Sequence, residues 1–154
     1  GKSTVGSLLA QRLGYAFEDA DRFHSEANLE KMRNAIPLCD EDRVPWLASL
    51  NHLLHGWWET GTSGVLACSA LKKRYREILS DGSPMQTLQF VHLDGARELI
   101  EKRLATRTNH FMPPFLLASQ FDTLECPDSE GVIKVSIEPP PEQIVEQILE
   151  RLLF

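Results

Sequence analysis

Short strand-like runs alternate with amphipathic helix-like segments along the whole chain, and this alternation restricts the fold more than any other feature. Helices are predicted over 2–13, 25–33, 40–60, 71–79, 97–106 and 116–121, and after the prolines at 139–141. Strands are predicted over 15–19, 65–68, 88–93 and 132–137. Strands that are each followed by a helix favour an α/β fold with a parallel sheet.

Residue types at the ends of these segments also carry information. Ser25 and Asp40 precede apolar helical patterns, so we expect them to be N-caps. Gly14 follows the first helical pattern and is a predicted stop. Residues 65–68 form a continuous apolar run, which is typical of a strand that is buried on both faces.

Length and charge narrow the range of functions. A chain of 154 residues can form one domain with a substantial core. Its formal net charge of −6 argues against a protein that binds nucleic acid or anionic membranes, because such proteins usually carry a basic surplus. A local basic pocket for a small anion remains compatible with this charge.

Three cysteines, Cys39, Cys68 and Cys126, lie far apart and form no C-x-x-C pair, which makes a zinc site a weak interpretation. Their odd number and the lack of a signal peptide favour reduced thiols and a cytoplasmic location. No apolar run approaches the roughly 18 residues of a membrane helix.

The chain begins with Gly-Lys-Ser-Thr, which are the last positions of the phosphate-binding motif G-x-x-x-x-G-K-[ST]. In such a loop Lys2 reaches the terminal phosphates and the Ser3 hydroxyl binds Mg²⁺. The tetrapeptide is weak evidence by itself, since the same residues can form a helix N-terminus with an incidental lysine and no phosphate site. We expect the strand and loop residues of the motif to precede Gly1, so that the N-terminus is a truncated edge.

An acidic segment, Asp19-Ala20-Asp21, follows the first predicted strand and is the second feature that suggests chemistry. Ligands of parallel α/β sheets bind beyond the carboxyl ends of the strands. One aspartate can therefore support Mg²⁺ while the other accepts a proton from a substrate hydroxyl. A solvated acidic turn is the alternative.

Six stretches between residues 1 and 125 together resemble the gluconokinases of the P-loop, shikimate-kinase-like type. They are GKSTVGSLLAQRLG, FEDADRFHSEANLEKM, IPLCDEDRVPWL, LACSALKKRYREIL, VHLDG and RLATRTNHFMPPFLLASQFDTLE. The resemblance implies a single three-layer P-loop kinase domain over 1–154, with a small helical lid at about 104–122 and its central first strand absent from this chain. It also implies ATP-dependent phosphorylation of D-gluconate to 6-phosphogluconate, with Mg²⁺, and suggests a homodimer.

The same resemblance implies a role for particular residues. The nucleotide-binding set is Gly1, Lys2, Ser3, Thr4, Arg103 and Arg107, and the metal set is Ser3 and Asp19. The substrate-binding set is Asp21, His24, Arg43 and Lys72, and the catalytic set is Asp21, Lys2, Arg103 and Arg107. Asp21 is the implied base toward the sugar-acid hydroxyl.

Physical chemistry supports two of these assignments, each with an alternative. The planar fork of Arg43 suits a carboxylate, although a helical pairing of Arg43 with Asp40 is also possible. Arg103 and Arg107 share one helix face and suit the charge of a phosphoryl group in transfer, although a solvated basic face is common on helices.

Two other functions stay open. One is a P-loop kinase for a different small molecule, such as shikimate. The other is a non-catalytic isoform or fragment that binds a partner or fails to fold, because a chain without the first strand would lack most of the backbone cradle for the phosphates.

Overall fold

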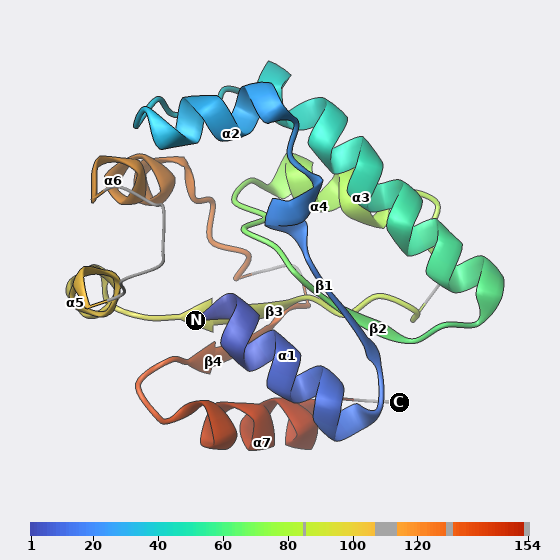
Figure 1. Cartoon of the computed structure of the whole chain (residues 1–154). Coiled ribbons are helices and arrows are strands. Elements are labelled where there is room, and N and C mark those ends of the chain that lie inside the picture. The colour runs from blue at the N-terminus through green and yellow to red at the C-terminus, as the bar shows by residue number, and fades with distance from the viewer. Residues whose placement is uncertain (85, 107–113, 129–130, 153–154) are drawn as a thin grey trace.

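The computed structural model describes residues 1–84, 86–106, 114–128 and 131–152 (Figure 1). Its helices are α1 (Lys2–Leu13), α2 (Glu26–Arg33), α3 (Asp40–Thr60), α4 (Lys73–Ser80), α5 (Arg97–Ala105), α6 (Pro114–Thr123) and α7 (Pro141–Arg151), with a 3₁₀ turn, η1 (Ala20–Phe23). Its strands are β1 (Ala16–Asp19), β2 (Gly64–Ala67), β3 (Val91–Asp94) and β4 (Ile133–Ser136). The predicted α/β order is confirmed, with shifts at the ends of several elements.

The strands pair in parallel, as predicted. β1 pairs with β2, so that Phe17 lies opposite Val65, and β3 pairs with β4, so that Leu93 lies opposite Val135. Within the described part of the chain these pairs form separate two-stranded sheets. Parallel pairing places the carboxyl ends of β1 and β2 side by side, which brings Asp19 next to the end of β2.

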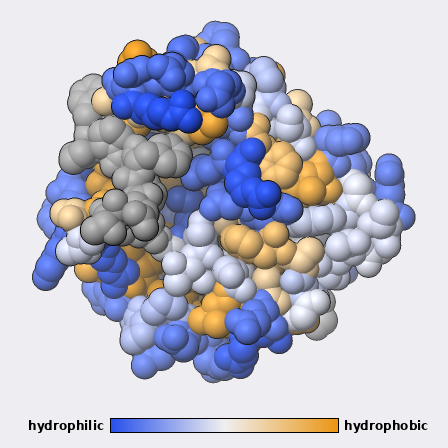
Figure 2. Space-filling view, viewed as in Figure 1, coloured by the Kyte–Doolittle hydropathy of each residue, from blue (hydrophilic) through white to orange (hydrophobic). Residues whose placement is uncertain are grey.

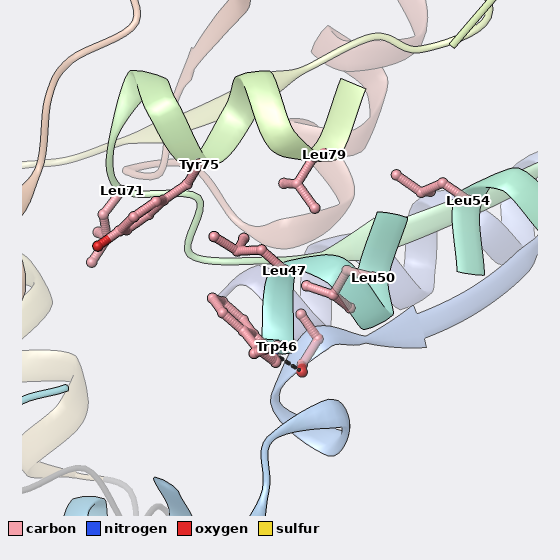
Figure 3. Close-up of a cluster of buried hydrophobic side chains, with 8 residues drawn as sticks. Trp46, Leu47, Leu50, Leu54, Leu71, Tyr75 and Leu79 are labelled. Carbon is pink, nitrogen blue, oxygen red and sulfur yellow. Dashed lines mark hydrogen bonds between the residues drawn. The ribbon is translucent and has the colours of Figure 1, made fainter. Parts of the chain in front are cut away.

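Two hydrophobic clusters hold the elements together. One joins α3 and α4 and contains the side chains labelled in Figure 3, namely Trp46, Leu47, Leu50, Leu54, Leu71, Tyr75 and Leu79. The other joins α1, β4 and α7 and contains Val5, Leu9, Val135, Ile144, Val145 and Ile148. α1 and α7 lie alongside each other in Figure 1. The first cluster fixes α3 against the turn after β1, because the Trp46 indole donates to the Ala20 carbonyl at 2.7 Å.

The helix ends confirm two predictions and correct one. The Ser25 hydroxyl accepts a hydrogen bond from the Asn28 amide and caps α2. Gly14 ends α1 in the left-handed region, with φ of 71°. The prediction that Asp40 caps α3 was wrong, because the N-cap is Cys39. The Asp42 carboxylate instead reaches back and accepts from the Cys39 amide at 3.0 Å, which leaves Asp40 free to bond elsewhere.

Two glycines allow a matched test of this backbone geometry. A Cβ at Gly14 or at Gly56 meets no atom within 4 Å, but only Gly14 has a positive φ. We expect Gly14→Ala to lower the free energy of unfolding by about 1–2 kcal/mol, because alanine is strained in the left-handed region. Gly56→Ala lies inside α3 and should raise it by about 0.5–1 kcal/mol. Urea unfolding followed by circular dichroism measures both, and equal stability of the two variants would contradict the explanation.

The surface is mixed in character. Figure 2 shows hydrophilic residues over most of one face, with smaller hydrophobic areas between them, which is ordinary for a folded protein. Among the described residues, no helix combines the length and apolarity needed to cross a membrane.

Candidate active site

The start of α1 offers backbone donors to an anion. Its first turn has no side-chain cap, and Lys2, Ser3 and Thr4 are exposed there. The first amides of a helix lack partners within the helix, and they form the positive end of its dipole. This geometry suits a phosphate, with the Lys2 ammonium adding a full positive charge.

Ser3 and Asp19 meet at this helix start. The Ser3 hydroxyl donates to Oδ2 of Asp19 at 2.5 Å, and Oδ1 of Asp19 accepts from the Asp21 amide at 3.0 Å. Asp19 therefore caps the η1 turn and fixes the backbone at Asp21. The Ser3 hydroxyl and the Asp19 carboxylate both offer oxygen atoms, which are the ligands that Mg²⁺ prefers, so these two residues fit the predicted metal. The described residues contain no group of three or more His, Cys, Asp or Glu side chains that suits a metal ion. A cation here would therefore share its coordination with a ligand or water.

Four of the predicted residues line one pocket. Lys2 comes from α1, Asp21 from η1, His24 from the segment before α2, and Arg43 from α3. The sequence interpretation depended on Lys2 and Asp21 sharing a site, and the pocket brings them together. Its remaining lining residues are Met32, Pro37, Leu38, Trp46, Ser69, Leu116, Ser119 and Gln120. Apolar atoms and a few polar groups thus surround two cations and a carboxylate, the composition expected of a site for a small polar anion.

His24 is held tightly within this pocket. Its ring stacks on Trp46, with ring centroids 4.3 Å apart and an angle of 16° between the ring planes. Its Nδ1 lies 3.3 Å from the side-chain nitrogen Nδ2 of Asn28. Burial, with a smaller contribution from the positive charge of Arg43, lowers the pKa of His24 to about 4. His24 is therefore neutral at pH 7.

Arg43 is buried, with 7% of its surface exposed, and it is braced from one side. Its guanidinium donates to the Tyr75 hydroxyl at 3.2 Å and lies over the Tyr75 ring. The Tyr75 hydroxyl in turn donates to Asp40. Asp40 thus reaches Arg43 through Tyr75, and the direct helical pairing considered from the sequence is replaced by this longer connection.

Lys72 lies on the outer side of the same network. Its ammonium donates to Asp40 at 3.0 Å and sits over the Tyr75 ring. Hydrogen bonds from Tyr75 and Lys72 lower the pKa of the Asp40 carboxyl. Lys72 is not among the residues that line the pocket, so its contact with substrate stays a prediction.

The predicted lid arginines are placed only in part. Arg103 is exposed on α5 and donates to the carbonyls of Ile137 at 2.7 Å and Glu138 at 3.4 Å. Arg107 lies outside the described residues. The role of both toward a nucleotide stays a prediction.

Cys68 lies beside this site without taking part in it. Loss of hydration raises the pKa of its thiol to about 12, while the charges of Lys2, Asp21 and Asp19 make smaller contributions of mixed sign. At neutral pH the thiol is protonated and a poor nucleophile.

Several residues of the site had no role in the sequence interpretation. Ser69, Tyr75, Ser119 and Gln120 lie within the stretches quoted for the family resemblance, as does Asn28, but their residue types alone indicate no chemistry. Trp46 is 3% exposed and belongs to the hydrophobic core. It also lines the pocket and stacks on His24, so it serves both purposes.

Comparison with known proteins gives consistent results. A family model described as shikimate kinase matches residues 1–152. A probable gluconokinase from Rattus norvegicus is 47% identical over 169 residues, covering 99% of this chain and 91% of the relative. A gluconokinase from Gluconobacter oxydans is 46% identical, covering 97% and 83%. The crystal structure of a gluconokinase from Sinorhizobium meliloti superposes with a TM-score of 0.88 at 40% identity, covering 99% and 85%.

Proposed function

Because this chain belongs to the shikimate kinase family, and within it to the gluconokinases, we propose that it transfers the terminal phosphoryl group of ATP to the 6-hydroxyl of D-gluconate. The products are ADP and 6-phosphogluconate. The observation that carries the proposal is the single pocket in which Lys2 and Asp21 lie together with His24 and Arg43. A phosphate site, a proton acceptor and a carboxylate site are the parts that this reaction needs.

The phosphates of the nucleotide bind at the start of α1 in this proposal. The amides that follow Gly1 donate to the phosphate oxygens, with Thr4 in the same exposed turn, and Lys2 reaches the transferring group. In this proposal Arg103 and Arg107 contact the phosphates when the lid closes. Their charges then stabilise the phosphoryl oxygens in the transition state.

Ser3 and Asp19 would hold Mg²⁺ beside these phosphates. Their hydrogen bond, 2.5 Å long, keeps the Ser3 and Asp19 oxygens close enough together for one cation to contact both. When bound, Mg²⁺ supplies neutralisation of the charge on the phosphate oxygens. The Asp19 carboxylate keeps its second oxygen on the Asp21 amide, and so orients the residue next to the reacting hydroxyl.

Asp21 receives the proton of the substrate hydroxyl. As the new bond forms between that oxygen and the phosphorus, the bond from phosphorus to the bridging oxygen of ADP breaks, and the proton passes to the Asp21 carboxylate. Phosphoryl transfer needs alignment more than a strong base. Orienting the hydroxyl is therefore as much a part of the role of Asp21 as accepting its proton.

Arg43 binds the carboxylate of gluconate at the other end of the substrate. Its buried guanidinium is held by Tyr75, which limits the rotation of the fork and favours bidentate binding. His24 contacts the hydroxyl-bearing chain between the two ends. Lys72 pairs with Asp40 at 3.0 Å beside the pocket, and in this proposal its ammonium also contacts the substrate.

We treat residues 1–154 as one kinase domain with a lid at about 104–122. Support for the lid comes from α6, because Leu116, Ser119 and Gln120 on this helix line the pocket opposite α1. Movement of α6 would therefore open or close the site. A homodimer and a cytoplasmic location stay predictions.

A substrate assay tests this function. We expect ADP release, measured with a coupled enzyme assay, to depend on both MgATP and D-gluconate, and ³¹P NMR to detect 6-phosphogluconate. Shikimate and D-gluconate should be compared at equal concentrations, since the family model is named for shikimate kinase. Faster turnover of shikimate would favour the alternative kinase, and a folded chain that turns over neither acid would favour the non-catalytic alternative.

A further inference from the structure

Asn28 makes two contacts through one nitrogen in the wall of the pocket. Its side chain is buried, with 5% of the residue exposed. The amide nitrogen Nδ2 lies 2.9 Å from the backbone carbonyl oxygen of Asp42 and 3.3 Å from Nδ1 of His24. The residue thus joins α2 to the start of α3 and touches the pocket histidine at the same time.

These contacts determine which ring nitrogen of His24 carries the proton. A carbonyl oxygen only accepts hydrogen bonds, so the amide group facing Asp42 must be the donating NH₂ end of Asn28. The second hydrogen of that NH₂ group then points to Nδ1 of His24, and Nδ1 must accept it. In a neutral imidazole the other nitrogen holds the proton, which places it on Nε2.

The surroundings of His24 reinforce this state. One ring face is covered by Trp46, and the Nδ1 edge is occupied by Asn28. Among the described residues no protein group bonds to Nε2, although His24 lines the pocket. The charged groups around the ring are Arg43 from α3, Asp21 from η1 and Lys2 from α1. Burial and the nearby Arg43 lower the pKa of His24 to about 4, so a second proton on Nδ1 is disfavoured.

We propose that Asn28 is a positioning residue that holds His24 in its neutral form with the proton on Nε2, so that the pocket presents an uncharged donor to a hydroxyl oxygen of the sugar acid. This inference rests on the proposed function, and it assigns different roles to Arg43 and His24 in binding the substrate. Arg43 supplies the charge that attracts a carboxylate. His24 supplies a directional hydrogen bond that selects a hydroxyl at a fixed distance along the substrate.

The test replaces Asn28 by Asp, which keeps the shape and turns the donor into an acceptor. In the wild-type chain we expect ¹⁵N NMR of the imidazole to show His24 neutral from pH 5.5 to 8, with Nδ1 unprotonated. His24→Gln identifies its signal among the five histidines. In Asn28→Asp we expect a proton on Nδ1, a rise in the pKa of His24 of about 2 units, and a KM for gluconate about tenfold higher with a smaller change in kcat.

Asn51→Asp is the matched control. Asn51 is a partly buried amide that donates to the carbonyls of Ile78, Leu79 and Asp81, away from the pocket. The same substitution there should leave the tautomer and the pKa of His24 unchanged. It also shows how much an Asn→Asp change at a partly buried position lowers stability without any effect on His24.

Several results would overturn the inference. A wild-type His24 with its proton on Nδ1, or one that is charged at pH 6.5, contradicts it even if Asn28→Asp does not fold. An Asn28→Asp variant that folds with an unchanged tautomer and unchanged KM also contradicts it. If the chain turns over no sugar acid but the tautomer behaves as expected, the proposed function fails while the assignment of Asn28 to His24 is supported.

Discussion

Replacing Asp21 by Asn should lower kcat for gluconate phosphorylation by about 10²–10⁴-fold, the usual contribution of general acid–base catalysis. The amide has nearly the shape of the carboxylate but does not accept the hydroxyl proton. The backbone at position 21 should stay in place, because its amide donates to Asp19. KM for gluconate and for ATP should change much less than kcat, since binding depends on other groups.

Glu18→Gln is the control for this prediction. Glu18 lies on the same strand, β1, and its carboxylate pairs with Arg22 at 3.3 Å. Steady-state kinetics should show less than a twofold change in kcat for this variant. An Asp21→Asn enzyme that keeps more than a tenth of the wild-type kcat would rule out Asp21 as the proton acceptor.

Replacing Arg43 by Lys should lower kcat/KM for gluconate by about 10²-fold, mainly through KM, because lysine lacks the planar fork that binds a carboxylate at two points. Lysine keeps the positive charge, so the loss reports geometry more than electrostatics. The shorter reach of the ammonium also breaks the bond to Tyr75, which now fixes the guanidinium at 3.2 Å. KM for ATP should stay close to the wild-type value.

Two comparisons make this second prediction specific. Arg22→Lys changes an exposed arginine that pairs with Glu18, and it should leave the kinetics unchanged. Inhibition by a polyol of the same length without a carboxylate should be equally weak in wild type and Arg43→Lys. A rise in KM for ATP as large as that for gluconate would place Arg43 at the nucleotide instead.

Local sequence patterns predicted the elements well, because each depends on residues close together in the chain. The period of the apolar residues gave α1 its bounds at Lys2 and Leu13, and Gly14 ended it for a steric reason that is also local. The start of α3 was harder. The sequence predicted Asp40 as the cap, but the cap is Cys39, because the Asp42 side chain folds back onto the Cys39 amide.

The parts of the site were predictable to different degrees. Lys2 and Asp21 stood out because a lysine at a helix start and an aspartate at a strand end suggest phosphate and proton chemistry by themselves. Asn28 and Tyr75 did not, since an amide or a phenol acquires a role only from its partner. Those partners, the Asp42 carbonyl and the Arg43 guanidinium, are 14 and 32 residues away in the chain.

By itself, therefore, the sequence determined the order of parallel strands and helices, the cationic start of the first helix and the acidic end of the first strand. Only the tertiary structure decided that Lys2, Asp21, His24 and Arg43 face one pocket, and that the side-chain nitrogen of Asn28 lies against Nδ1 of His24. The reason is that periodicity and capping act over a few residues. Pocket geometry and tautomers depend on contacts between elements, which arise only when α1, α2 and α3 pack around the end of β1.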